Sequence, residues 1–168
     1  MTTSAAWTDE SNQANAYYGV SVATAGDVNG DGYGDVIVGA KSYDNGQTDE
    51  GRAYLYLGSS SGLATSAAWT GESDQESTSY GVSVASAGDV NGDGYGDDIV
   101  GAYAYDNGQT NEGRAYLYLG SSSGLATSAV TSGLGWAHFH RNHREPGHQP
   151  VARAHTPARA DSADEAQG

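Results

Sequence analysis

The sequence has no cysteine, one phenylalanine and one methionine, and only 7 lysine and arginine residues against 21 aspartate and glutamate residues. Without cysteine no disulfide can form, so cysteine usage does not indicate whether the protein works in an oxidising or a reducing compartment. The net charge of −14 argues against nucleic acid as a partner, because phosphate binding needs a basic surface. No apolar run is long enough to cross a membrane, and the first residues show neither the basic nor the apolar region of a signal peptide.

Glycine and tyrosine are abundant instead, with 25 and 12 copies, and they recur in an internal repeat with a period of 62 residues. Residues 18–67 and 80–129 differ at only 5 positions. Periods of this length are typical of propellers, solenoids and arrays, in which one unit cannot bury its own apolar faces.

Each repeat contains a nine-residue acidic loop, at residues 27–35 and 89–97, with oxygen-bearing side chains at loop positions 1, 3, 5 and 9 and glycine at position 6. Hard cations such as Ca²⁺ take about six to eight oxygen ligands, which such side chains on a tightly turning backbone supply. We therefore predict two calcium sites. The expected ligands, with the tyrosines contributing their carbonyls, are Asp27, Asn29, Asp31, Tyr33 and Asp35 in the first loop and Asp89, Asn91, Asp93, Tyr95 and Asp97 in the second.

An EF-hand does not fit these loops, because position 12 holds Val38 or Val100 where that motif has glutamate. The flanking residues are also typical of strands rather than helices. The acid at position 9 is then expected to close the site, most simply as a bidentate ligand. The alternative is a metal-free turn, since aspartate and glycine are common in turns. The presence of two complete copies of the acidic loop makes this alternative less favoured.

The hydrophobic alternation predicts four short strands in each repeat. They are expected at residues 19–25, 36–40, 52–57 and 67–70, and again at 81–87, 98–102, 114–119 and about 127–131. Residues 4–8, which carry Trp7, look like a further outer strand that has no blade before it. The predicted fold class is all-β: a partial propeller over residues 4–131 with two four-stranded antiparallel blades, at 18–70 and 80–131.

The pattern Tyr18-Gly19, acidic loop, Gly39-Ala40, repeated from Tyr80, resembles the FG-GAP repeat. That repeat builds the β-propeller of integrin α subunits and occurs in many bacterial secreted proteins. The resemblance covers about residues 4–131, although tyrosine replaces the phenylalanine of the name and Lys41 and Tyr103 replace its proline. It implies that the chain is part of a longer, bacterial-type extracellular protein, and that the cation loop joins the innermost and second strands of each blade.

Two features interrupt the pattern. Asp98 stands where the first repeat has Val36. Its carboxylate is interpreted as an extra cation ligand, as a residue at an exposed edge, or as a sign of a damaged copy, and the last two interpretations are favoured. After residue 131 the composition changes, since all 5 histidines and all 3 prolines lie in 132–168. A disordered His/Arg/Pro tail is expected there, in preference to a transition-metal group of His138, His140 and His143.

No catalytic constellation is visible. The repeats have no histidine and no cysteine, and their paired carboxylates lie inside the cation loops, so we predict that the chain is not an enzyme. The predicted function is a calcium-binding module for adhesion or ligand binding, extracellular or at a cell surface. Its partner would be an unknown protein or glycan, met by the face that carries loops 43–50 and 103–112.

Two alternatives remain open. A carbohydrate-binding, lectin-like propeller would use aromatic pockets, with tyrosine candidates Tyr17, Tyr18, Tyr43, Tyr103 and Tyr105. The chain could also be the accessory repeat portion of a secreted hydrolase.

Two blades cannot surround an axis, so the outer blade faces are expected to expose apolar side chains such as Val20, Val22, Leu55 and Leu117. Other blades in the parent chain, or self-association, would cover them.

Overall fold

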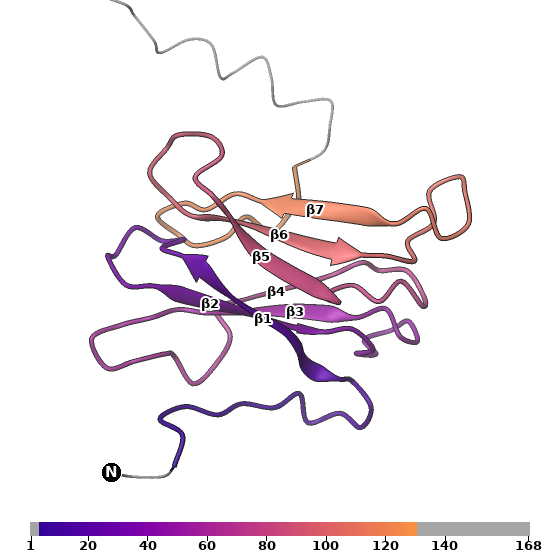
Figure 1. Ribbon diagram of the computed structural model, residues 1–168, viewed down its shortest axis with the longest axis horizontal. Coiled ribbons are helices and arrows are strands. Elements are labelled where there is room, and N and C mark those ends of the chain that lie inside the picture. The colour runs from indigo at the N-terminus through magenta and orange to yellow at the C-terminus, as the bar shows by residue number, and fades with distance from the viewer. Residues whose placement is uncertain (1–3, 131–168) are drawn as a thin grey trace, which may run out of the picture.

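The computed structural model describes residues 4–130, and within that range it contains strands and no helix. The strands are β1 (Tyr18–Gly26), β2 (Asp35–Ala40), β3 (Arg52–Tyr56), β4 (Trp69–Glu72), β5 (Ser83–Gly88), β6 (Asp97–Ala102) and β7 (Arg114–Tyr118). They form two antiparallel sheets in the orders β1-β2-β3-β4 and β5-β6-β7, stacked on each other in Figure 1. The predicted all-β class of partial propeller blades is therefore confirmed; the first sheet is called blade 1 and the second blade 2.

Alternation along the strands determines which side chains meet the neighbouring blade. In blade 1, Ile37, Leu55 and Trp69 are paired across adjacent strands and so lie on one face of the sheet. Ile37 and Leu55 are 0 % exposed, because blade 2 covers this face. We predicted that Leu55 would be exposed, which is wrong, whereas Val20 and Val22 on the opposite side are 44 % and 62 % exposed as expected.

Blade 2 has three strands in the described part of the chain, not the four that we predicted. Residues 127–130 form no strand, although the Val130 amide still donates to the Leu117 carbonyl at 2.8 Å. In blade 1 the outer strand begins at Trp69, and the residue at the matching position of the second repeat is Thr131. The repeat therefore departs from its pattern at the point where the fourth strand would begin.

Residues 4–8 form no strand either, which corrects a second expectation. Trp7 is instead held in place by its side chain, whose Nε1 donates to the Ala64 carbonyl at 3.0 Å. Its ring packs edge-on against the Tyr56 ring, with the two ring centroids 5.0 Å apart. A strand forms only where a neighbouring strand accepts its backbone groups, and no strand of the described chain pairs with this segment.

Backbone contacts hold the two blades together. The Gly96 amide donates to the Asp27 carbonyl at 2.8 Å, and the Tyr80 amide donates to the Glu50 carbonyl at 3.0 Å. The Ser21 hydroxyl donates to the Gly81 carbonyl at 2.7 Å. Main-chain groups thus make most of the bonds named here between the two blades.

The His/Arg/Pro tail predicted for residues 132–168 lies outside the described residues. Among residues 4–130, no helix has the length and apolar character needed to span a membrane.

Candidate metal-binding loops

The first acidic loop joins β1 to β2, and its backbone turns tightly around the carboxylate of Asp27. One oxygen, Oδ1, accepts the amides of Gly30 at 2.7 Å and Asp31 at 3.0 Å. The other, Oδ2, accepts the amide of Gly32 at 2.8 Å. Gly30 and Gly32 have φ angles of +73° and +87°, which side chains with a Cβ rarely adopt, so glycine is required for this turn.

The middle of the loop is arranged by Asn29 and Asp31. The Asn29 side-chain oxygen accepts the Asp31 amide at 3.1 Å, and its Nδ2 donates to Asp31 Oδ2 at 2.9 Å. The remaining carboxylate oxygen, Asp31 Oδ1, accepts the Tyr33 amide at 2.9 Å. Asn29 and Asp31 therefore lie within hydrogen-bond reach of each other, as neighbouring ligands of one cation must.

The last acid of the loop, Asp35, is 1 % exposed and anchors the loop to the rest of the blade. Its Oδ2 accepts the Val28 amide at 2.9 Å, and its Oδ1 accepts the Gly58 amide at 2.8 Å. Burial raises the pKa of the Asp35 carboxyl, and these two amide bonds oppose that rise. Each carboxylate oxygen has a second lone pair free for another partner, so the bidentate role expected for Asp35 stays a prediction.

The second loop, between β5 and β6, repeats this geometry. Asp89 accepts the amides of Gly92, Asp93 and Gly94 at 2.7, 3.0 and 2.9 Å. The Asn91 side chain donates to Asp93 at 2.8 Å, and Asp93 accepts the Tyr95 amide at 3.0 Å. Asp97 is 0 % exposed and accepts the amides of Val90 and Gly120, each at 2.8 Å. Two loops of the same sequence thus adopt the same hydrogen-bonded turn.

The donor set of each loop consists of oxygens alone, which suits a hard divalent cation. Within residues 4–130, however, no three Asp, Glu or His side chains are gathered closely enough to hold a metal ion. The carboxylates accept backbone amides instead, most of them from their own loop. The residue types and the turn therefore fit calcium, while the ligand assignment, including the carbonyls of Tyr33 and Tyr95, stays a prediction.

Asp98 lies directly after the second loop and is 0 % exposed, so the interpretation as an exposed edge is wrong. Neither of its carboxylate oxygens has a hydrogen-bond partner among the described residues. Burial raises the pKa of Asp98 to about 8, and the nearby carboxylates of Asp35 and Asp97 add to the rise. An extra cation ligand and a damaged copy both stay predictions for Asp98.

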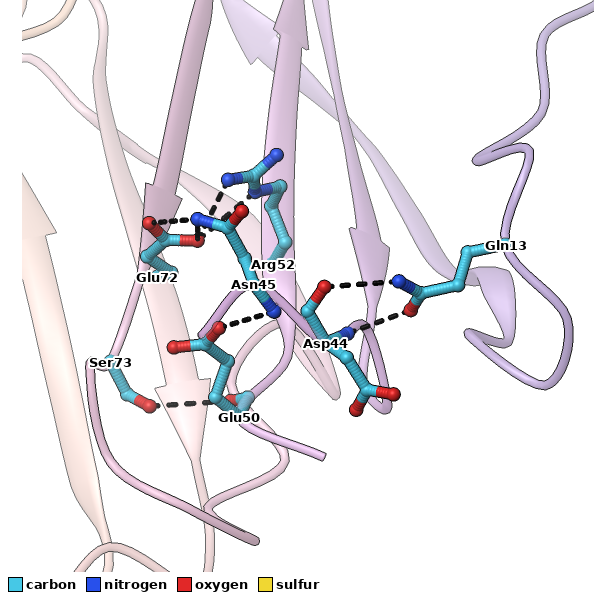
Figure 2. Close-up of polar contacts among 7 residues, drawn as sticks. All are labelled: Gln13, Asp44, Asn45, Glu50, Arg52, Glu72 and Ser73. Carbon is cyan, nitrogen blue, oxygen red and sulfur yellow. Dashed lines mark hydrogen bonds and ion pairs between the residues drawn. The ribbon is translucent and has the colours of Figure 1, made fainter. Parts of the chain in front are cut away.

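The opposite loops, which we expect to meet a partner, are tied together by polar contacts (Figure 2). The Gln13 side chain both donates to the Asp44 carbonyl at 3.0 Å and accepts the Asp44 amide at 2.7 Å. Asn45 Nδ2 and Arg52 Nη2 both donate to Glu72, at 2.9 and 2.8 Å. Loop 43–50 is therefore in contact with the connection before β1.

Two details of this region differ from expectation. We expect the polar side chains of loop 43–50 to be exposed on the partner face, but Glu50 is 0 % exposed, because the connection between the blades covers it. Among the tyrosines considered for sugar binding, only Tyr17 and Tyr103 are well exposed, at 59 % and 63 %. The ring of Tyr105 is covered by the Arg114 guanidinium, whose carbon lies 4.0 Å from the ring centroid.

The sequence analysis missed Asp9, which accepts hydrogen bonds from the hydroxyls of Tyr18 and Tyr56. Its counterpart in the second repeat is Gly71, so no repeat pattern could point to it.

Comparison with known proteins decides the family. The FG-GAP repeat matches at residues 18–56 and at residues 80–118, each time spanning three strands and the acidic loop between the first two. The chain belongs to the FG-GAP repeat family. The resemblance noted in the sequence is thereby confirmed, whereas nothing in the comparisons bears on a bacterial-type origin.

The relatives of this FG-GAP chain include two kinds of large protein. It is 40 % identical over 121 residues to integrin alpha-PS2 of Drosophila melanogaster, covering 67 % of this chain and 8 % of the integrin. It is 36 % identical over 134 residues to integrin alpha-8 of Gallus gallus, covering 74 % of this chain and 12 % of the integrin. It is also 34 % identical over 134 residues to phosphatidylinositol-glycan-specific phospholipase D of Rattus norvegicus, covering 69 % of this chain and 16 % of that protein. The chain thus corresponds to a small part of each relative.

Proposed function

We propose that this chain is a calcium-binding β-propeller repeat module, extracellular or at a cell surface, that serves adhesion or ligand binding and is not itself catalytic. The observation that carries the proposal is the pair of acidic loops, which present the same all-oxygen donors in the same glycine-dependent turn. The matches to integrin α subunits support the adhesion part.

Calcium would act by relieving repulsion within each loop. Three aspartates and one asparagine crowd into nine residues, and a divalent cation offsets their charge in the folded state alone. Extracellular modules bind calcium at about 10⁻⁴ to 10⁻³ M, so such sites fill outside cells and stay empty in the cytosol. At a calcium concentration about ten times the dissociation constant, each site would raise the free energy of unfolding by roughly 1.4 kcal/mol.

Isothermal titration calorimetry tests the proposal by counting sites. We expect two calcium ions per chain, and one in each of the variants Asp31→Ala and Asp93→Ala. The matched control is Asp44→Ala, which removes an exposed aspartate outside the loops and should keep both sites. Equal melting temperatures in millimolar calcium and in chelator would contradict the metal assignment.

A second candidate is an accessory repeat portion of a secreted hydrolase, favoured by the similarity to a phosphatidylinositol-glycan-specific phospholipase D. The full-length gene decides between the two, because a catalytic domain in the same reading frame would support the hydrolase. A lectin-like role rests on exposed tyrosines such as Tyr17 and Tyr103 alone, and a glycan array tests it.

A further inference from the structure

Among residues 4–130, no strand covers the outer edge of β7, although β4 covers the same edge in blade 1. There β4 pairs with β3, bringing Trp69 opposite Leu55 and Glu72 opposite Arg52. In blade 2, β7 is the last strand of the sheet in the described part of the chain. The two blades are otherwise built on nearly the same sequence, so this edge is an incomplete copy of a known arrangement.

A cavity of about 490 Å³ lies along this edge, lined by residues that include Asn107, Arg114, Tyr116 and Val130. In blade 1 the residues matching Asn107 and Arg114 are Asn45 and Arg52, and both bond to the carboxylate of Glu72 on β4 (Figure 2). Arg114 has no carboxylate partner among residues 4–130. The cavity is therefore the place where a fourth strand with a glutamate belongs.

The residues that follow in the same chain lack the required side chains. Residues 131–134 read Thr-Ser-Gly-Leu, without the tryptophan and glutamate of the matching stretch Trp69–Glu72. One other stretch in the repeat register does have them: residues 7–10 read Trp-Thr-Asp-Glu, and they stand 62 positions before Trp69–Glu72. The segment Trp7–Glu10 is called the donor segment below.

The donor segment already occupies the place of an outer strand relative to blade 1. Trp7 donates to the Ala64 carbonyl at 3.0 Å, as Trp69 donates to the Ala126 carbonyl at 3.0 Å. Trp69 thus belongs to β4 of blade 1, while its indole contacts blade 2. The indole of Trp7 contacts blade 1 in the same way. Among residues 4–130, no preceding blade offers the donor segment a strand edge.

Within residues 4–130, the β7 edge of the same molecule is out of reach of the donor segment. Figure 1 shows the N-terminal segment and β7 at opposite ends of the stacked blades. The β7 edge of a second copy of the chain, however, can pair with the donor segment of the first copy while both copies keep the fold described here.

The flat faces of the blades fit the same arrangement. On the side of blade 2 that points away from blade 1, here called the tail face, Val90 and Ile99 are 53 % and 37 % exposed. Their counterparts in blade 1, Val28 and Ile37, are 0 % exposed because blade 2 covers them. A blade with the sequence of this repeat would cover the tail face equally well, and blade 1 of a second copy is such a blade.

We propose that a second copy of this chain docks head-to-tail on blade 2, and that its donor segment adds to β7 as the fourth strand, with its Glu10 paired to Arg114. Such a contact joins two different surfaces, so repetition closes a ring or extends a filament. Main-chain bonds along β7 supply affinity, and the Glu10–Arg114 pair sets the register. The proposal stands apart from the calcium sites, and the test is run with calcium and with chelator.

Sedimentation velocity of the full chain across a wide concentration range tests the proposal. We expect the wild type to assemble beyond the monomer. Glu10→Arg and Arg114→Glu each place like charges together at the new contact, and each should raise the concentration for half-assembly about tenfold or more. An equimolar mixture of the two variants restores an opposite-charge pair at every contact, so it should assemble like the wild type.

The control is Glu76→Arg, which makes the same charge change at an exposed position outside the donor segment and should leave assembly unchanged. Circular dichroism of each variant checks that the sheets remain folded. A wild type that stays monomeric at all concentrations would overturn the proposal. Assembly that is indifferent to both charge reversals, or a mixture that fails to restore it, would equally overturn it.

Discussion

Glu50 and Glu112 occupy the same position in the two repeats, but only one of them is buried. Glu50 is 0 % exposed and its Oε2 has no hydrogen-bond partner in the part of the chain that the structure describes, whereas Glu112 is exposed. Burial raises the pKa of Glu50, against the opposing effect of the amide bonds from Asn45 and Gln47. The ionised form of Glu50 therefore weakens the folded state.

The pH dependence of stability should report this difference. Because the pKa of Glu50 is raised in the folded state, its contribution to stability is complete below the unfolded pKa of about 4.3 and is lost as the pH rises through the folded value. Glu50→Gln should thus match the wild type near pH 4 and exceed its free energy of unfolding by about 1–3 kcal/mol at neutral pH. Urea denaturation at several pH values measures this difference in the free energy of unfolding. Glu112→Gln is the control, and an equal pH dependence in both variants would contradict the explanation.

Asp98 provides a second test at the residue scale. A buried carboxylate without partners costs stability, and the first repeat has valine at this position. Asp98→Val should raise the free energy of unfolding by about 1–3 kcal/mol, measured by urea denaturation. Asp98→Asn keeps an unsatisfied polar group at this buried position, so it should gain less. A loss of stability in Asp98→Val would instead indicate that the carboxylate holds a ligand.

At the scale of single elements, the acidic loops are what the sequence predicts best. The bonds around Asp27 reach only 3, 4 and 5 residues ahead, so local sequence determines them. The bond from Gly58 to Asp35 spans 23 residues and needs the folded blade. The absence of a strand at 4–8 was beyond prediction for the same reason, because a strand depends on an available neighbouring edge. Residues 127–130 match residues 65–68 of blade 1, which form no strand either.

Gly39 in β2 and Gly101 in β6 occupy matching positions in the two blades, so substitutions there test the junction between the blades. A Cβ on Gly39 would run into the Gly81 carbonyl of the next blade, whereas a Cβ on Gly101 would meet chiefly the rotatable hydroxyl of Ser83. Neither glycine has a positive φ, so alanine introduces no backbone strain at either site. Gly39→Ala should lower the free energy of unfolding by about 1–3 kcal/mol, and Gly101→Ala by clearly less. Equal losses in thermal melts would show that the blades are not packed through this contact.

At the scale of the whole molecule, position in the array determines burial where sequence cannot. Leu55 and Leu117 lie in identical segments, yet Leu55 is 0 % exposed and Leu117 is only partly buried, because only the first has a blade stacked on it. The repeat and its strands could be read from the alternation of residues. Which face of each blade is covered could not, since that depends on how many blades stand on either side.

Hydrogen exchange should reveal this asymmetry directly. Residues 38–40 of β2 and 100–102 of β6 have the same sequence, and each stretch follows an isoleucine, so their intrinsic exchange rates are equal. The tail face leaves Ile99 37 % exposed while Ile37 is 0 % exposed, so local opening of blade 2 breaks fewer apolar contacts. At low protein concentration we expect the amides of residues 100–102 to exchange about tenfold or more faster than those of residues 38–40. At concentrations where a second copy covers the tail face, the difference should shrink. Equal rates under dilute conditions would mean that the two blades open only as one cooperative unit.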